Sequence, residues 1–283
     1  MHRYTFANAD GARRPPARER RSAAVLAPRE PGELDMKPAS AWTRRLTYST
    51  ALSPAEQHVL EEVGAGMRTT GAHEALAKAG DPADRLFVVL KGLVCRFKLL
   101  PDGQRQILGF LLPGDMCDAR ELLMTNFDHS ISALMPSDVV TLDAAMVQRL
   151  ERYPNILLAM SRHASTNLAI GREWLVNLGH RTALERIGHL ICELFTRFET
   201  VGLTQERAFE LTLTQSELGD TLALSSVHVN RTLMELRRLK LVTFQNRQVR
   251  IHDFAGLRLV SGFDADYLSF GANRLATGII AHA

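Results

Sequence analysis

The sequence predicts an α+β chain with a β-rich first half, a long central helix and a mainly helical C-terminal part. Short apolar runs at residues 86–90, 93–99 and 105–112 are separated by turns that contain glycine or proline, which is typical of a β-barrel or jelly roll. From Pro154 onward, apolar residues instead recur every three or four positions, as they do on one face of a helix. This change of period divides the chain near Tyr153.

Length and composition fit a folded protein of two domains. The chain has 283 residues, of which 46% are hydrophobic, so each domain can bury a core of its own. No apolar run is long enough to span a bilayer, and the N-terminus lacks the apolar segment of a signal peptide. We therefore expect a cytoplasmic protein with no membrane partner.

The predicted barrel occupies residues 41–152. A short helix that begins at Ser53 and Pro54 precedes its strands, and further strands are expected at residues 129–134 and 139–142. Polar turn residues such as Pro101-Asp102-Gly103 separate neighbouring runs. Many short strands with regular turns favour a β-barrel or jelly roll.

The helix that begins at Pro154 carries a seam at coiled-coil spacing, and residues 153–181 are therefore assigned to a dimerisation helix. The alternative is that this seam packs on the barrel of its own chain. A second helix is expected at residues 182–198. The seam consists of Leu157, Met160, Ala164, Asn167, Gly171, Trp174 and Leu178.

Residues 211–242 carry the most specific pattern in the chain. Thr214 and Glu217 have the spacing of a capping box, which starts a helix, and Gly219 allows a second helix to approach closely. Ser225 is expected to cap that second helix. Two short helices joined by a tight turn predict a helix-turn-helix, which places its second helix in the major groove of DNA. The inner face of the second helix should consist of Val229, Leu233 and Leu236.

The neighbourhood of this motif supports DNA binding. Residues 241–244 and 248–251 flank a short polar turn and predict a β-hairpin, which would form a wing. A short strand at residues 210–213 should lead into the motif. Between residues 225 and 250 there are six Lys or Arg against one acid, a local charge that would attract a duplex. The alternative is an ordinary helical hairpin with a solvated basic face.

Residues 1–40 are rich in Arg, Ala and Pro and are predicted to form a disordered basic tail. Their eight basic and five acidic residues account for the net charge of +3. The tail could contact DNA phosphates, could have no function, or could precede a true start at Met36. The remaining chain is near neutral, so its basic surface is local to the motif.

The order of these parts resembles the Crp/Fnr family of bacterial transcription regulators over about residues 46–254. This resemblance implies a cyclic-nucleotide-binding-like sensor barrel, a dimerisation helix, a winged helix-turn-helix at residues 182–256 and a C-terminal extension at residues 257–283. It also implies a homodimer that binds double-stranded DNA at an inverted repeat and acts on RNA polymerase. The matching motifs are Leu90-Lys91-Gly92, Leu112-Pro113-Gly114-Asp115, Leu213-Thr214-Gln215-Ser216-Glu217-Leu218-Gly219 and residues 225–231.

Base reading is assigned to the N-terminal half of the second motif helix. Arg231 can donate two hydrogen bonds to guanine, Asn230 can pair with adenine, and Val227 can touch a thymine methyl group. Val227 stands where the family commonly has a glutamate that accepts from cytosine. Ser226 and His228 could reach a base or a phosphate, although Asn230 could equally contact phosphate and His228 could face solvent. Phosphate contacts are assigned to Thr214, Ser225, Arg237, Arg238, Arg247 and Arg250, although any of the four arginines could be plain surface charge.

The resemblance leaves the effector unknown. Cyclic-AMP-responsive members hold the cyclic phosphate with an Arg-Ser pair, and Phe127-Asp128 stands at that place. Asp128 would repel a phosphate, so we expect no cyclic AMP binding, although Arg120 could restore a phosphate site. If the barrel holds an effector, its pocket is expected to include Cys117, Asp118, Arg120, Glu121, Asp128 and His129.

No cofactor or metal is predicted. No cysteine precedes Cys95, so the N-terminal iron–sulfur cluster of the oxygen-sensing members is not expected. His73 or His129 could serve as an axial haem ligand, but no spacing argues for it.

The function predicted from these residues is transcriptional regulation rather than catalysis. Cys95, Cys117 and Cys192 are too dispersed for a metal or disulfide motif, and no nucleophile–base pair or phosphate loop is present. We therefore expect no enzyme activity. The alternative is a small-molecule or redox sensor whose helix-turn-helix contacts proteins instead of DNA, with Cys117 either a redox thiol or an inert small residue.

Overall fold

The computed structural model describes residues 40–117 and 125–268. The predicted basic tail, apart from Ser40, and three expected pocket residues, Asp118, Arg120 and Glu121, lie outside the described residues. No described helix is long and apolar enough to cross a membrane.

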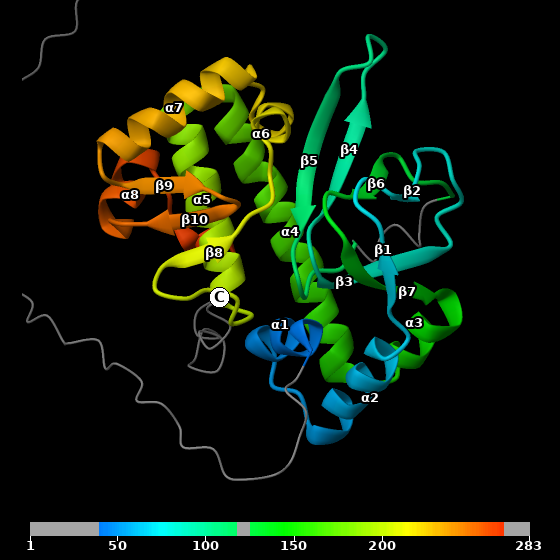
Figure 1. Cartoon of the computed structure of the whole chain (residues 1–283). Helices are drawn as coiled ribbons and strands as arrows, with labels where there is room; N and C mark the ends of the chain where they lie inside the picture. The colour runs from blue at the N-terminus through cyan, green and yellow to red at the C-terminus, as the bar shows by residue number, and fades with distance from the viewer. Residues whose placement is uncertain (1–39, 118–124, 269–283) are drawn as a thin grey trace, which may run out of the picture. The chain divides into compact units, whose positions relative to one another are not determined.

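The first half of the chain forms two small antiparallel sheets, as the short apolar runs predict (Figure 1). One sheet has the strand order β1-β7-β3 and the other has the order β2-β6-β4-β5. Strands β3 to β7 correspond to the predicted runs, whereas β1 and β2 have three residues each and are too short to show an alternating pattern. The strands are β1 (Arg68–Thr70), β2 (Ala75–Ala77), β3 (Arg85–Lys91), β4 (Val94–Leu99), β5 (Arg105–Leu111), β6 (Ser130–Ala133) and β7 (Ser137–Asp143).

The two sheets share an apolar core, which confirms the predicted jelly roll. Phe87 and Val139 from the first sheet pack with Val94 and Ile131 from the second, and all four side chains are buried. Because successive strand residues point to opposite faces, the other face of β4 and β5 is left for the helices. Cys95 and Ile107 on that face belong to a different core, which they share with the C-terminal part.

Three short helices pack against the barrel through a separate apolar cluster. Ser53 and Glu56 form the capping box that starts α2 (Pro54–Gly64), as expected. Two further helices, α1 (Ala41–Ser49) and α3 (Ala144–Glu151), were not predicted from the sequence, and Ser40 and Asp143 cap them respectively. Their buried members, such as Trp42 and Val147, contact the first turns of the long helix.

The long helix α4 (Pro154–His180) begins where the change of period predicts, but of the seven residues of the predicted seam only Leu157 is exposed, and Ala164, Gly171 and Leu178 are half-buried. Met160, Asn167 and Trp174 are buried against the same chain, so they cannot form an outward seam. The exposed apolar side chains of α4 are Leu157, Leu158, Leu168, Leu175 and Val176. The error has a simple cause: helical spacing shows which residues share a face, but not which partner covers that face.

The C-terminal part is built around α5 (Ala183–Glu199), which supplies the largest share of its core. The sheet β8-β10-β9 and the helices α6, α7 and α8 surround α5 (Figure 1). The remaining elements are β8 (Ala208–Glu210), α6 (Gln215–Leu222), α7 (Ser226–Arg238), β9 (Val242–Gln245), β10 (Gln248–Ile251), α8 (Phe254–Ser261) and η2 (Ala265–Leu268). This is the predicted winged helix-turn-helix.

Two details of this part differ from the sequence predictions. The strand expected at residues 210–213 lies earlier, at β8, because β10 begins at Gln248 and its ladder with β8 therefore ends at Glu210. The expected division at residue 256 falls inside α8, and Phe263 and Leu268 beyond it are buried in the same core. The residues just after the wing are therefore part of the C-terminal core.

Candidate nucleic-acid interface

The first helix of the motif starts as the sequence predicts. The Thr214 hydroxyl oxygen accepts from the Glu217 amide at 3.1 Å, and the Glu217 carboxylate accepts from the Thr214 amide at 2.8 Å. This capping box satisfies two backbone donors that the helix itself cannot pair. It fixes the N-terminus of α6 at the surface, where Gln215 and Ser216 are exposed.

The turn between α6 and α7 depends on two unusual positions. Ala223 ends α6 in the left-handed conformation, with φ of 53°, and the chain then passes directly over Gly219. A Cβ atom at Gly219 would lie 2.4 Å from the Leu224 carbonyl oxygen. At that distance no side chain can be accommodated. The close approach predicted for Gly219 is confirmed, and the turn backbone rather than a helix makes it.

The second motif helix, α7, presents a polar face to solvent. Ser225 caps it by accepting from the His228 amide at 3.2 Å, and Val229 and Leu236 are fully buried beneath it. Val227 is 80% exposed. The exposed side chains of α7 are Ser226, Val227, Asn230, Arg231, Met234, Arg237 and Arg238, whereas His228 is half-buried. Four of the five predicted base readers therefore face outward.

Met234 was not among the predicted contacts. Its side chain is 67% exposed and lies three positions after Arg231, so both are on the same face of the helix. A large exposed apolar side chain next to base-reading candidates is suited to contact with a thymine methyl group or a sugar. The helical spacing from Arg231 was the signal that could have identified it.

The four arginines among the predicted phosphate contacts divide into two groups. Arg237 and Arg247 are exposed and form no ion pair with any described residue. Arg238 is bound by Glu235 through two hydrogen bonds of 2.9 and 2.7 Å, and Arg250 lies 3.9 Å from Glu206. The hydroxyl groups of Thr214 and Ser225 already serve as helix caps, although both residues are exposed.

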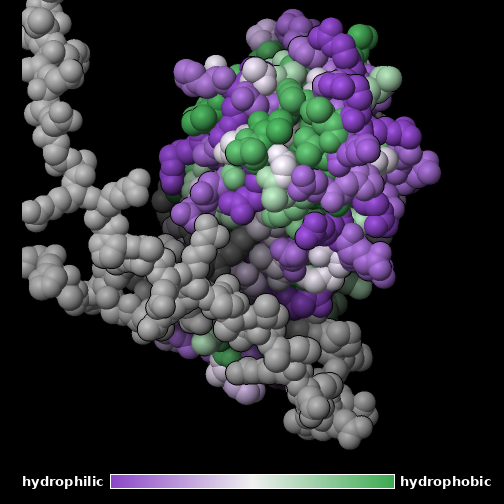
Figure 2. All heavy atoms as spheres, turned by 90° about the vertical axis from the view of Figure 1, so that its left-hand side faces the viewer, coloured by the Kyte–Doolittle hydropathy of each residue, from purple (hydrophilic) through white to green (hydrophobic). Residues whose placement is uncertain are grey.

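The wing is a two-residue hairpin between β9 and β10, as predicted. Asn246 and Arg247 both have positive φ, 53° and 60°, which is the backbone of the turn that matches strand twist in tight hairpins. The outer face of the sheet forms an open hollow of about 530 Å³ lined entirely by polar residues, among them Arg247 and Arg250. Figure 2 views the molecule from the left-hand side of Figure 1 and shows hydrophilic side chains around a smaller apolar patch. Leu239 and Leu259 are exposed apolar residues of this domain.

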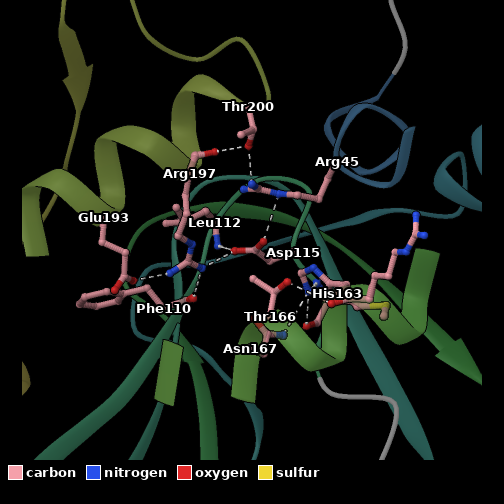
Figure 3. Close-up of polar contacts among 12 residues, drawn as sticks. Arg45, Phe110, Leu112, Asp115, His163, Thr166, Asn167, Glu193, Arg197 and Thr200 are labelled. Carbon is pink, nitrogen blue, oxygen red and sulfur yellow. Dashed lines mark hydrogen bonds and ion pairs between the residues drawn. The ribbon is translucent and has the colours of Figure 1, made fainter. Parts of the chain in front are cut away.

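A chain of buried charges joins the barrel to α5 (Figure 3). Arg197 donates from Nη2 to Asp115 Oδ2 at 2.6 Å, and from the same nitrogen to the Phe110 carbonyl at 2.8 Å. Arg45 of α1 approaches the other carboxylate oxygen, with Nε 3.3 Å from Oδ1. Burial alone would raise the pKa of Asp115, but the two guanidinium groups lower this pKa to about 2. The carboxylate therefore stays ionised although it is almost inaccessible to water.

The same arginine extends the network to the long helix and to η2. Arg197 Nη1 donates to Glu193 Oε1 at 3.0 Å. Glu193 Oε2 accepts from Trp174 Nε1 of α4 at 2.9 Å and from the Tyr267 hydroxyl at 3.0 Å. Burial raises the pKa of Glu193, and these donors offset part of that cost. No sequence signal indicated this network, because Arg197 and Asp115 are 82 positions apart.

Three of the expected effector residues, Cys117, Asp128 and His129, lie in the described part of the chain. Cys117 is fully buried in the barrel core, so the structure favours the inert small residue over an accessible redox thiol. Asp128 Oδ1 lies 2.7 Å from His129 Nδ1, and its other oxygen lies 3.4 Å from Lys98 Nζ. The carboxylate is thus already paired with two basic side chains of the chain itself.

Among the described residues, no group of three or more His, Cys, Asp and Glu side chains could hold a metal ion. All three cysteines are buried, and burial raises the pKa of Cys95 to about 11 and that of Cys192 to about 12. At neutral pH these two thiols stay protonated, which is the unreactive form.

Comparison with known proteins follows the same division of the chain. Residues 67–152 match the cyclic nucleotide-binding domain family, and residues 185–260 match the Crp-like helix-turn-helix domain family. The transcriptional activatory protein AadR of Rhodopseudomonas palustris is 29% identical over 214 residues, 74% of this chain and 87% of AadR. The transcriptional activator protein Anr of Pseudomonas aeruginosa is 25% identical over 218 residues, 77% of this chain and 89% of Anr.

A solved structure shows the same fold. FixK2 from Bradyrhizobium japonicum superposes with a TM-score of 0.62 at 22% identity, covering 70% of this chain and 98% of FixK2. At this level of identity the likeness shows that the two chains share a fold. Together with the two domain matches and the activators above, this shows that the chain belongs to the Crp/Fnr family of DNA-binding transcription regulators.

Proposed function

We propose that this regulator reads its DNA site with the outer face of α7, placed in the major groove. The observation that carries this proposal is the division of α7 into two faces. Val229 and Leu236 are fully buried, whereas Val227 is 80% exposed and Asn230 and Arg231 are exposed beside it. The exposed face of the helix is the one with donors that can distinguish bases, and no described part of the chain covers it.

We also propose that two copies pair along α4 and bind an inverted repeat. Leu157, Leu168 and Leu175 are 42%, 38% and 72% exposed, and their spacings of eleven and seven residues keep them on one side of a helix. Apolar side chains at this spacing on a long helix are typical of a helix–helix interface. Two-fold pairing would present two α7 helices to half-sites about one helical turn apart.

The effector remains unknown, but the proposal excludes cyclic AMP. Asp128 stands at the position expected for phosphate binding and is hydrogen-bonded to His129. A phosphate there would be repelled by the Asp128 carboxylate. We therefore expect cyclic AMP to leave the DNA affinity unchanged, and saturable cyclic AMP binding in calorimetry would contradict this. With DNA as its target, the protein is expected to act in the cytoplasm and to influence RNA polymerase at promoters.

The decisive experiment is selection of duplexes from a random pool by the purified full chain, with and without cell extract. We expect an enriched inverted repeat whose half-sites are one helical turn apart, with a guanine in each half-site. Enrichment without any symmetry would contradict dimer binding. If no duplex is enriched in either condition, the protein does not recognise DNA sequence by itself.

A further inference from the structure

The hairpin formed by β4 and β5 touches the helix-turn-helix directly (Figure 1). Arg105, at the start of β5, donates from Nε to Asp220 Oδ2 of α6 at 2.9 Å, and its Nη2 lies 2.9 Å from the same oxygen. The next residue, Gln106, donates from Nε2 to the Thr221 carbonyl at 3.3 Å. Two adjacent barrel residues therefore hold two adjacent residues of α6.

These contacts fall at the end of α6, where a helix has carbonyl groups without partners of its own. The Thr221 carbonyl accepts from Gln106, and the Leu222 carbonyl accepts from Arg186 of α5 at 3.0 Å. A guanidinium near the C-terminus of a helix also interacts favourably with the helix dipole. The barrel thus supplies one of the caps that α6 needs, and α5 supplies another.

The hairpin is itself firmly placed. The Arg105 guanidinium lies over the Phe97 ring of β4, 5.7 Å from its centroid. Phe97 packs against the core of the winged domain, and Ile107 of β5 is buried in the same core with Leu218 and Leu222 of α6. The contact is therefore a supported surface rather than a single flexible ion pair.

We propose that Arg105 and Gln106 are positioning residues for DNA binding. They hold the C-terminal end of α6 against the barrel and so fix the turn at Ala223 that sets the direction of α7. The contact is compatible with DNA binding, because the reading face of α7 stays exposed while it is made. It also pairs the Asp220 carboxylate, which would otherwise repel the phosphates of a bound duplex. This inference rests on the proposed reading of DNA by α7.

The test is a charge swap at the pair, measured on a duplex that the wild-type protein selects from a random pool. Arg105→Glu should weaken binding about fivefold more than the control Arg68→Glu. The control makes the same change of charge at a barrel arginine that is paired with Glu74 at 3.2 Å, away from α6. Asp220→Arg in the Arg105→Glu background should recover most of the loss, because the pair is restored with its charges exchanged.

Salt dependence separates positioning from direct contact with DNA. A positioning residue leaves the number of phosphate contacts unchanged, so Arg105→Glu should keep the wild-type slope of log Kd against log salt concentration. A slope reduced by about one would make Arg105 a phosphate contact and overturn the proposal. Equal losses for Arg105→Glu and Arg68→Glu, or no recovery in the swap, would also overturn it.

Two controls keep the outcome interpretable. Arg105 and Asp220 are each about one quarter exposed, so both exchanges should leave the thermal unfolding midpoint close to that of Arg68→Glu, and binding is measured well below it. If the single variants unfold early, Arg105→Gln, which only removes the charge, replaces Arg105→Glu. Wild-type protein that selects no duplex would refute the proposed function, whereas wild-type binding with no special effect at Arg105 would refute this inference alone.

Discussion

Arg197 Nη2 lies 2.6 Å from Asp115 Oδ2, and both side chains are only 3% exposed. The acid comes from the turn that follows β5, and the base comes from the helix at the centre of the winged domain. An ion pair so completely removed from water costs much to desolvate and is costly to break on one side only. It therefore strongly favours one particular packing arrangement of the barrel against α5.

Loss of Arg197 should destabilise the whole chain. Arg197→Met leaves Asp115 and Glu193 buried with fewer donors, and we expect a loss of about 3–5 kcal/mol in the free energy of unfolding. Urea unfolding monitored by circular dichroism measures it. Arg149→Met is the matched control, because Arg149 pairs with Glu62 at 2.7 Å but is half exposed, and it should cost at most about 1 kcal/mol. Similar losses for both variants would mean that the buried network adds nothing special.

Gly219→Ala should disrupt the helix-turn-helix. The added methyl group would lie 2.4 Å from the Leu224 carbonyl oxygen, so the turn must move, at a cost of about 1–3 kcal/mol. Specific DNA binding should fall even where the protein is fully folded, because the turn sets the angle of α7. Gly179→Ala in α4 meets no atom within 4 Å and should be neutral or slightly stabilising. Mobility-shift assays measure the DNA binding of the two variants, and thermal unfolding measures their stability.

Stability should fall between pH 7 and pH 5 because of His189. Burial, and then the nearby Arg181, lower its pKa to about 4. The unfolded chain takes up a proton near pH 6.5, whereas the folded chain does not until about pH 4, so protonation favours unfolding throughout that interval. We expect about 2 kcal/mol less stability at pH 5 than at pH 7 from this residue.

His189→Phe should remove that part of the pH dependence. The ring packs between Phe263 and Tyr267, at centroid distances of 5.2 and 5.9 Å, so phenylalanine fits the site without a titrating group. His180→Phe, at the exposed end of α4, serves as the control. Unfolding free energies measured at both pH values for the three proteins test this, and an unchanged difference in His189→Phe would contradict it.

Charged residues on the outer face of α4 should abolish the proposed dimer. Leu168→Glu with Leu175→Glu places two carboxylates where a second copy is expected to pack. Light scattering should then give the mass of a monomer, and binding to an inverted repeat should be lost. Leu259→Glu changes a side chain that is 85% exposed on α8 and should leave the mass unchanged. A wild-type monomer that still binds the full inverted repeat would contradict pairing through α4.

Arg231→Ala should affect sequence preference, not only affinity. If Arg231 reads guanine, its loss costs about 1–3 kcal/mol on the selected site and relaxes the preference at one base per half-site. Arg237→Ala is expected to weaken binding equally on all sequences and to reduce the salt slope by about one, as a phosphate contact does. Equal losses on every duplex for Arg231→Ala would reassign it to the phosphate backbone.

Features that are determined by residues close together in the sequence could be predicted from it. The capping box of Thr214 and Glu217 and the hairpin turn at Asn246 are decided within four residues, and the structure confirms both. The covered face of α4 could not be predicted, because it depends on which distant elements pack on the helix. Met160 and Trp174 recur at helical spacing just as the exposed Leu168 and Leu175 do, although the first two are buried.

The contacts between the barrel and the winged domain had no sequence signal at all. Arg105 and Asp220 are 115 positions apart, and single charges at such distances do not stand out from surface charges. For the candidate site, the exposed residues of α7 followed from helical spacing. Met234 was missed because an apolar residue in a helix is ordinarily assigned to the core.

The helix α4 is a structural member of two cores at once. Its first turns, with Ile156 and Ala159, are buried with the helices that cover the barrel, and its last turns, with Ile170 and Trp174, are buried with α5. Because one helix belongs to both cores, unfolding of either core removes support from the other. Heat or urea should therefore denature the described chain in one transition. A small molecule that tightens the barrel would then raise the melting temperature of the wing as well, which makes calorimetry a direct screen for the missing effector.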